Sequence, residues 1–171
     1  MNAPQAQPAV HVQTIHRFAF GEFHAEMGGH YAGIVRAQNG ENEYHLFISP
    51  RDTDIPDIEF GNYGKKITGA DSVNDGLANT HALIAHGGHP AAEACTALRS
   101  GGFDDWYLPA QAEAMLAFAN CRDQFETEWY WTSTQYSADY AWVQSFDYGL
   151  HDSGPKGDEY RARAVRRVSV I

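Results

Sequence analysis

Residues 129–150 read WYWTSTQYSADYAWVQSFDYGL, an aromatic-rich stretch without Lys or Arg. In its second half, Trp142 and Phe146 fall on one face of an extended chain, and Ala141 and Val143 fall on the other. A strand that is apolar on both faces is typical of the centre of a sheet, where both sides are covered. The stretch therefore predicts a central strand, with Trp142 and Phe146 in the core.

Strand patterns occur at both ends of the chain, in about residues 10–60 and 129–171. An alternation typical of a strand opens the first zone, at Val10, Val12, Phe18 and Phe20. The next two apolar runs flank a turn signal, Asn39-Gly40, so we expect a β-hairpin. In the second zone, WYWTST, YAWVQSFDYG and RARAVRRVSV are separated by polar loops, and each is expected to be one strand.

Helical patterns fill the middle of the chain, about residues 70–120. Three helices are expected: one through Val73, Leu77, Leu83 and Ile84 that ends at Gly87-Gly88, one from Pro90 to Gly101-Gly102, and one just past Pro109 with the apolar face Ala112, Met115, Leu116 and Ala119. Glu113 falls in the first turn of the last helix, where a carboxylate suits the helix dipole. Strands grouped around a helical middle favour an α+β fold with antiparallel pairing.

Length and composition indicate one domain. The chain has 171 residues, 43% of them apolar, and a net charge of −10. We expect a flexible arm at residues 1–9 and a single domain at 10–171. No secretory signal or membrane span is expected, because no basic stretch precedes an apolar run and no long apolar run occurs. Cys95 and Cys121 are expected to be buried free thiols.

The acidic charge argues against a nucleic-acid or membrane partner. The exception is the run RARAVRR, which holds four arginines at 161–167. Two interpretations are open: the arginines pair with acidic groups such as Asp105 or Asp147, or they form a basic patch. We favour the first, because a strand would direct Arg166 away from its neighbours.

Four ordered sequence blocks carry a resemblance to a known family. They are Asp-Trp-x-Leu-Pro at 105–109, Tyr-Trp-Thr-Ser-Thr at 130–134, Ala-Trp-x-x-x-Phe-x-x-Gly at 141–149 and Arg-x-Val-Arg at 163–166. Over about residues 100–168 the chain resembles the collagen-like adhesin C-terminal domain family of bacteria and phages. The residues of the four blocks are expected to have structural roles. The aromatic rings lie in the core, the first block is a strand that stops at its proline, and the arginines of the last block form ion pairs.

The resemblance implies a C-type-lectin-like fold, with an antiparallel or mixed sheet, paired termini and two or three flanking helices. Residues 28–48 are similar to the leader of phage members, which implies a phage or prophage origin. One departure concerns Ala110, since family members usually carry Ser or Thr after Leu-Pro, where it caps the helix. Losing such a cap costs about 1 kcal/mol, so this helix must depend more on packing.

No complete catalytic or metal-binding pattern is found. The related formylglycine-generating oxidases use a close cysteine pair late in the fold, and no cysteine follows Cys121. The zinc pattern HExxH and the calcium triplets of C-type lectins are absent as well. His81, His86 and His89 are expected to be solvated residues near a helix end. We therefore expect no catalytic residue, no metal and no cofactor.

The expected ligand-binding face lies in segments 135–140 and 147–158, where the resemblance implies that such folds present a surface. Its residues combine rigid rings with short polar groups, a chemistry suited to contact: Tyr136, Tyr140, Tyr148, His151 and Asp152. The expected function is a non-catalytic binding module for a protein or glycan, located in the host cytoplasm or the virion. Two alternatives remain open, an accessory protein that inhibits a host protein and a self-assembling virion component, which would be a homo-oligomer.

Overall fold

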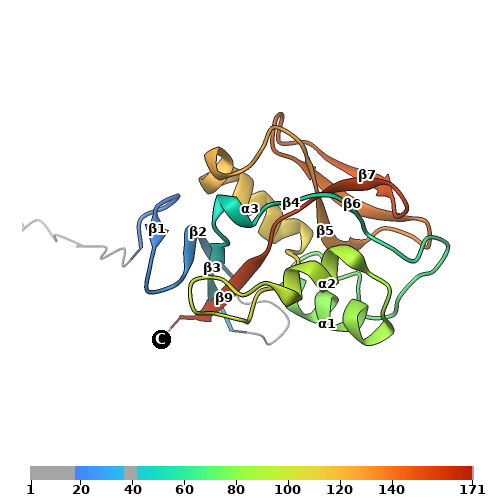
Figure 1. Ribbon diagram of the computed structural model, residues 1–171, viewed down its shortest axis with the longest axis horizontal. Helices are drawn as coiled ribbons and strands as arrows, with labels where there is room; N and C mark the ends of the chain where they lie inside the picture. Colours follow the sequence, from blue (N-terminus) through green and yellow to red (C-terminus); the bar gives the residue numbers. More distant parts are fainter. Residues whose placement is uncertain (1–17, 37–41, 171) are drawn as a thin grey trace, which may run out of the picture.

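The computed structural model describes residues 18–36 and 42–170. The expected arm at residues 1–9, the alternating Val10 and Val12, and the Asn39-Gly40 turn lie outside the described residues. The fold is α+β, as predicted. Two sheets lie at opposite ends of the molecule, with one helix between them and the other two beside the second sheet (Figure 1).

The first sheet joins the two ends of the described chain. It has four antiparallel strands in the order β1-β2-β3-β9: β1 Phe23–His24, β2 Gly29–Val35, β3 Tyr44–Ile48 and β9 Val165–Ser169. The pairing of β2 with β3 confirms the expected hairpin, and that of β3 with β9 joins the N-terminal and C-terminal parts. The strand expected through Phe18 and Phe20 is wrong, because Phe18 lies in a bend and Phe20 lies in a turn, where Gly21 has a φ of 74°.

The second sheet is mixed, with the order β4-β8-β5-β6-β7. Its strands are β4 Ile55–Glu59, β5 Trp129–Gln135, β6 Tyr140–Ser145, β7 His151–Pro155 and β8 Glu159–Ala162. Only β5 and β8 run parallel. β6 pairs on both sides, so the predicted central strand is correct. Phe146, just after the strand, is buried as expected, but Trp142 is only half-buried, because no helix covers its part of the sheet.

Three α-helices occupy the middle of the chain as predicted: α1 Gly76–His86, α2 Pro90–Ala97 and α3 Gln111–Cys121. Two short 3₁₀ helices, η1 Arg51–Thr53 and η2 Arg122–Gln124, complete the elements of the part of the chain that the structure describes. Helix α1 ends at Gly87 as expected, whereas α2 ends before the expected Gly101-Gly102. Among the residues that the structure describes, no helix is both long enough and apolar enough to cross a membrane.

The buried face of α3 differs from the expected one. Ala114, Ala117 and Cys121 are buried together with Glu113, whereas Met115 is 51% exposed. The predicted apolar face left out Glu113, which was placed in the first turn because a carboxylate suits the helix dipole there. Glu113 instead faces inward, because buried hydrogen-bond donors surround its carboxylate. The missing cap at Ala110 is replaced from outside the helix, since Thr134 Oγ1 accepts from the Gln111 backbone N–H at 3.1 Å.

The stretch RARAVRRVSV is two strands, not one. β8 ends at Ala162 in the second sheet, and β9 begins at Val165 in the first. The chain crosses between the sheets at Arg163, which is fully buried. Its guanidinium donates to Asp54 Oδ1 at 3.1 Å and to the carbonyl oxygens of Ser49, Arg51 and Gln124. A buried guanidinium needs such a full set of acceptors, and distant segments supply them here.

The acidic pairing of the arginines is confirmed. Arg166 forms a bidentate pair with Asp105, at 2.8 and 2.9 Å. Arg161 and Arg163 share Asp54 instead, and Asp147 pairs with Arg122. Arg167 lies 3.2 Å from Asp75. With every arginine of this run neutralised, no basic patch forms there.

The core has two main parts, and the Asp-Trp-x-Leu-Pro block contributes to both. Trp106 and Leu108 pack in the cluster beside α1 and α2, which also holds Trp131. Tyr107 points into the cluster between α3 and the first sheet. Successive residues of an extended segment point in opposite directions, so this segment serves both clusters.

Candidate functional site

The turn between β5 and β6, residues 136–140, is here called the aromatic turn. Its backbone is held by hydrogen bonds from the N–H groups of Tyr136 and Ser137 to the Tyr140 carbonyl, both at 3.0 Å. The Ser137 hydroxyl oxygen accepts from the N–H groups of Asp139 and Tyr140, at 3.2 and 3.1 Å. Such side-chain bonds to nearby backbone stabilise turns. The turn is therefore fixed without using the side chains of its tyrosines.

Those tyrosine rings face outward. Tyr136 is 58% exposed and Tyr140 is 38% exposed. The Tyr136 ring contacts the half-buried Trp142 edge to face, with ring centroids 5.2 Å apart. Tyr140, Trp142 and the register partner of Trp142, Ser153, share one face of the sheet, because residues opposite one another in a ladder point the same way. The result is an exposed aromatic surface with a hydroxyl beside it.

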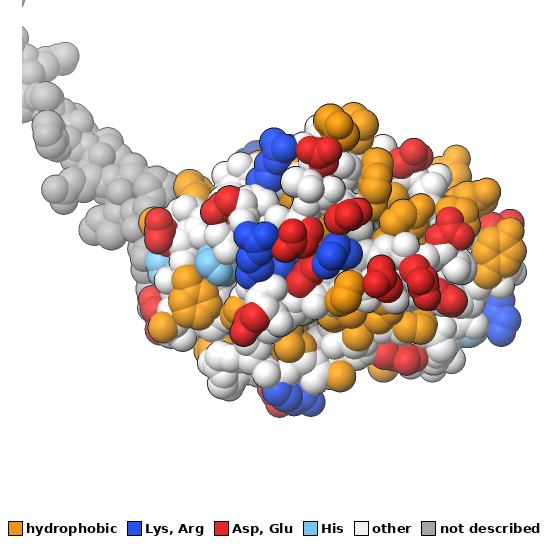
Figure 2. Space-filling view, turned by 45° about the horizontal axis from the view of Figure 1, so that its top comes forward, with side chains coloured by type: hydrophobic (Ala, Val, Ile, Leu, Met, Phe, Trp, Pro, Cys, Tyr) orange, Lys and Arg blue, Asp and Glu red, His pale blue; other side chains and the backbone are white. Residues whose placement is uncertain are grey.

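This surface exists because α3 covers only part of that face. The helix begins beside Thr134 and runs toward Tyr130 and Phe146, at the end of β5 and β6 farther from the aromatic turn. In Figure 2, hydrophobic side chains with acidic ones among them gather on the right-hand half of the molecule, where Figure 1 places the β6–β7 part of the sheet. The acidic residues there agree with the net charge of the chain.

The other expected binding residues lie apart from the aromatic turn. Tyr148 is 76% exposed, but it lies in the β6–β7 connection, beyond the far end of β6. The six residues of β6 span roughly 17 Å at the usual rise of about 3.4 Å per residue. His151 pairs with Gln144 near that far end, whereas Asp152 points to the opposite face. The structure brings Tyr136 and Tyr140 together, but it does not unite all five residues.

His151 lies beside the start of α3. Its Nδ1 atom is 3.5 Å from Gln111 Nε2, and its Nε2 atom is buried. Burial lowers the pKa of the His151 imidazole, because a charged ring would lose its hydration. A neutral His151 therefore contributes a polar group, and not a cation, to this end of the sheet.

Two buried polar residues that the sequence interpretation missed support the aromatic turn. Gln135 immediately precedes the turn, and its side-chain amide pairs with the backbone of Ile67: Nε2 donates to the carbonyl at 2.8 Å and Oε1 accepts from the N–H at 3.0 Å. Nε2 also lies 3.2 Å from the carbonyl oxygen of Ala70. The Gln135 backbone N–H donates to the same oxygen at 2.9 Å.

Lys156 supplies the remaining contact. Its ammonium group donates to Gln135 Oε1 at 2.7 Å and to the Lys65 carbonyl at 2.6 Å, and it lies 5.5 Å from the centroid of the Phe60 ring. The side chain is fully buried. Burial lowers the pKa of Lys156 to about 8. Hydrophobic periodicity could not have found this residue, since Gln and Lys normally indicate the surface.

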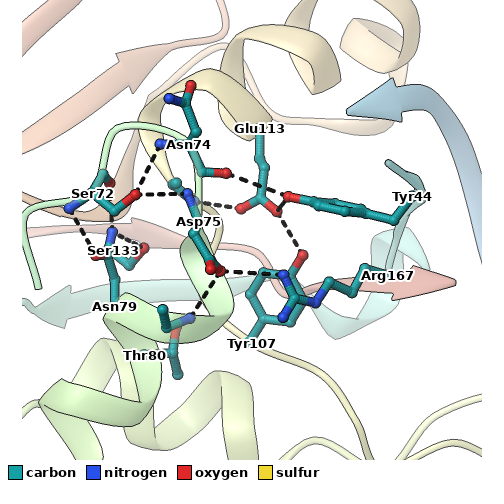
Figure 3. Close-up of polar contacts among 12 residues, drawn as sticks. Tyr44, Ser72, Asn74, Asp75, Asn79, Thr80, Tyr107, Glu113, Ser133 and Arg167 are labelled. Atoms are coloured by element: carbon teal, nitrogen blue, oxygen red, sulfur yellow. Dashed lines mark hydrogen bonds and ion pairs between the residues drawn. The ribbon is translucent and has the colours of Figure 1, made fainter. Parts of the chain in front are cut away.

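A second polar cluster lies between α1, α3 and the first sheet (Figure 3). Glu113 Oε1 accepts hydrogen bonds from the hydroxyls of Tyr44 and Tyr107, both at 2.6 Å, and Oε2 accepts from the Ala110 N–H at 2.7 Å. Burial raises the pKa of Glu113 to about 7. A carboxyl group with that pKa could serve in acid–base catalysis, but Glu113 is fully buried and its three contacts are all internal.

The rest of this cluster ties loop segments to helices. Asp75 accepts from the Ala78 N–H at 3.0 Å, which caps α1, and it also pairs with Arg167. Asn79 joins α1 to β5 by donating to Ser133 Oγ at 3.2 Å. Each group bonds to a neighbouring element, so the cluster stabilises the junction of α1, α3 and the sheets.

The thiols and histidines have structural surroundings. Cys95 and Cys121 are free and buried, as predicted, and burial raises the pKa of each thiol to about 12. His86 is exposed as expected, but the expectation for His89 is wrong: it is fully buried against Phe60, where burial lowers its pKa. Across residues 18–36 and 42–170, no three His, Cys, Asp or Glu side chains gather as metal ligands would.

A surface cleft of about 460 Å³ lies at the end of α3, away from the aromatic turn. Its walls are Ala119, Asn120, Arg122, Asp123, Phe125, Thr127 and Phe146. The Arg122 guanidinium already donates to the backbone carbonyls of Phe146 and Asp147. The cleft is therefore partly apolar, and the Arg122 guanidinium in its wall is already engaged by backbone carbonyls.

Comparison with models of protein families matches residues 79–166 to the Lcl C-terminal domain. This segment extends from within α1 into β9, so it includes Gln135, the aromatic turn and Lys156. A search of curated proteins finds no match.

Proposed function

The chain belongs to the Lcl C-terminal domain family, and we propose that it is a non-catalytic binding module that recognises a protein or glycan through the aromatic turn. The observation that carries the proposal is the exposure of Tyr136 and Tyr140 beside Trp142 on a turn whose backbone is already fixed. Exposed aromatic rings on rigid backbone are favourable for binding, because little conformational entropy is lost when a partner docks.

The chemistry of this surface suits either ligand class. Tyrosine rings offer flat apolar area with a hydroxyl at the edge, and Ser137, Ser153 and Asp139 lie in or beside the turn. A protein partner would bury the rings as anchors at the centre of an interface. A sugar would place the apolar face of its ring on an aromatic side chain and direct hydroxyls to these polar groups. Tyr148, His151 and Asp152 would serve only a ligand large enough to reach across the hairpin.

The proposal also covers the fold family of the module and its origin. The pairing of β3 with β9 and the helices between them support a C-type-lectin-like fold, related to the collagen-like adhesin C-terminal domain. We further propose a phage or prophage origin, on the basis of residues 28–48, with a place in the virion or the host cytoplasm. Inhibition of a host protein would use the same aromatic turn, so it is a form of this proposal.

Self-assembly by strand addition is disfavoured by the outer strands of the second sheet. Strand β4 contains Pro56, and Asp57 has a φ of 47° that interrupts its pairing. On β7, Pro155 lacks an N–H, and the Ser153 N–H already donates to Asp152 Oδ1 at 2.7 Å. Prolines, bulges and acidic groups at sheet edges hinder pairing with another chain.

The proposal can be tested by comparing two surface variants. Labelled wild-type protein is applied to a printed oligosaccharide array and to a displayed random-peptide library. The double variant Tyr136→Ser/Tyr140→Ser should lose binding to the selected probes, whereas Tyr148→Ser, at the far end of β6, should keep it. All three positions are exposed, so folding should be unaffected. Equal binding by the wild type and the double variant would refute the proposal.

A further inference from the structure

We propose that Glu113 and Tyr44 form a proton-controlled switch. When the Glu113 carboxyl group gains a proton, the Tyr44 hydroxyl donates to the Asn74 carbonyl instead of to the carboxyl group, and this bond links loop 72–75 to β3. The Tyr44 hydroxyl has one hydrogen, and two acceptors lie within its reach: Glu113 Oε1 at 2.6 Å and the Asn74 carbonyl oxygen at 3.3 Å (Figure 3). The two acceptors compete for this hydrogen, and the charge of Glu113 decides between them. The switch does not depend on the proposed function.

The observed distances are those of the ionised carboxyl group. Tyr44 and Tyr107 each lie 2.6 Å from Glu113 Oε1, which is the length of a hydroxyl hydrogen bond to a carboxylate. The contact of Tyr44 with the Asn74 carbonyl, at 3.3 Å, is longer than a well-formed hydroxyl hydrogen bond. Burial and the charge of Glu113 raise the pKa of both tyrosines, so each hydroxyl keeps its proton at neutral pH. In this state, both hydroxyls donate to the carboxylate.

A proton on Glu113 can be passed on in one direction within this cluster. The Oε2 side is closed, because a backbone N–H donates to this oxygen and a methyl group on Gly76 would lie 2.2 Å from it. The proton therefore lies on Oε1 and is donated to a tyrosine oxygen, and that tyrosine must direct its own hydrogen elsewhere. Tyr44 has the Asn74 carbonyl as a second acceptor, whereas no other acceptor among the described residues contacts the Tyr107 hydroxyl. Protonation thus completes a chain of hydrogen bonds from Glu113 through Tyr44 to Asn74.

The groups around the carboxyl group set the pH at which the switch acts. Burial is the main cause that raises the pKa of Glu113 to about 7, and the charge of Asp75, at the start of α1, acts in the same direction. Arg167, from β9, lies 3.2 Å from Asp75 and 5.2 Å from the centroid of the Tyr44 ring, so it offsets part of that charge. β3 and the segment before α3 contribute the neutral Tyr44 and Tyr107. The switch is therefore expected to act near neutral pH.

Loop 72–75, which leads into α1, already contacts two other elements. The Val73 carbonyl accepts from a backbone N–H in the first turn of α3 at 2.9 Å, and the Ser72 carbonyl accepts from the Thr134 hydroxyl in β5 at 2.9 Å. The hydrogen bond from Tyr44 adds β3, in the first sheet, to these contacts. Val73 is 46% exposed, so the loop is also part of the surface. Protonation therefore stabilises a surface loop at the junction of both sheets.

An NMR titration of the whole protein between about pH 5 and about 9 tests the switch. The side-chain carboxyl carbon shift of Glu113 reports its ionisation, and the backbone carbonyl carbon shift of Asn74 reports the bond from Tyr44. Both shifts should change with the same midpoint. The protection of the Asp75 amide against exchange should fall about fivefold from acidic to basic pH, which is the factor expected for one net hydrogen bond. A constant Asn74 shift, or the lack of a Glu113 transition in this range, would overturn the proposal.

Three variants separate the switch from a general effect of charge. In Tyr44→Phe the Asn74 transition should vanish while Glu113 still titrates, whereas it should remain in the matched control Tyr107→Phe, which removes the other hydroxyl at 2.6 Å. In Glu113→Gln the amide oxygen accepts from the Ala110 N–H, so the amide nitrogen faces Tyr44 as a permanent donor. The Asn74 shift of that variant should equal the acidic wild-type value at every pH. An Asn74 transition that persists in Tyr44→Phe, or the basic wild-type value in Glu113→Gln, would refute the switch.

Discussion

Replacing Glu113 by glutamine should change how the stability of the protein depends on pH. The carboxyl group is fully buried, and burial raises its pKa from the ordinary 4.5 to about 7. The folded protein therefore binds this proton more tightly than the unfolded chain does. The stabilisation is complete below pH 4.5 and is lost as the pH rises towards about 7. Glutamine has the same size but does not titrate in this range, so this part of the pH dependence should vanish.

The expected magnitude follows from the size of the shift. One pKa unit corresponds to about 1.4 kcal/mol, so the Glu113 carboxyl group should lower the free energy of unfolding by about 3 kcal/mol between acidic and neutral pH. This figure already includes the Tyr44, Tyr107 and Ala110 donors, which favour the carboxylate and so oppose the effect of burial. In the glutamine variant, one of these contacts becomes unfavourable, which costs roughly 1–3 kcal/mol at acidic pH.

Urea unfolding at several pH values between about 4 and about 8 measures both quantities. The free energy of unfolding of the wild type minus that of Glu113→Gln should fall by about 3 kcal/mol as the pH rises. His89 and His151 oppose this trend, because their lowered pKa values add stability as the pH rises, but they do so equally in both proteins. Glu126→Gln is the control, since Arg51 lowers the pKa of that exposed carboxyl and reverses the sign. A difference that stays constant with pH would refute the reasoning.

Three further predictions concern stability and reactivity. Thr134→Val should cost about 1–2 kcal/mol in urea unfolding, because α3 loses its only side-chain cap from β5. Gly61→Ala should cost about 2–3 kcal/mol, because its left-handed φ strains alanine and the new methyl group meets a carbonyl oxygen, whereas Gly157→Ala, where a methyl group has open space, should be neutral by the same assay. Cys95 and Cys121 should react with a disulfide reagent only after unfolding, since both are buried with pKa values near 12, and rapid labelling of the folded protein would contradict this.

The sequence predicted those parts of the fold that depend on apolar spacing and on helix or turn signals. The three helices, the hairpin of β2 and β3 and the central β6 all follow from local patterns. The two free thiols and the outward-facing Tyr136 and Tyr140 were also predicted from residue type and position.

The errors concern polar residues whose burial depends on distant partners. Glu113 was left out of the predicted apolar face of α3, yet it lies on the buried face, because tyrosines from other elements donate to its carboxylate. The strand through Arg163 was extended too far, because its acceptors come from residues far earlier in the chain. Lys156 was missed for the same reason. Trp142 was placed in the core because one sequence cannot show where a covering helix stops.

The crossing at Arg163 also bears on how the protein is made. During synthesis, β3 and β4 are made long before their partners β9 and β8. Asp54 likewise has neither of its arginine partners until residues more than a hundred positions later have been translated. Until then, the early strands have unpaired edges and cannot complete either sheet. The edges of β3 and β4 therefore stay unpaired until residues 159–169 have been made, and neither sheet can be completed before that segment is available.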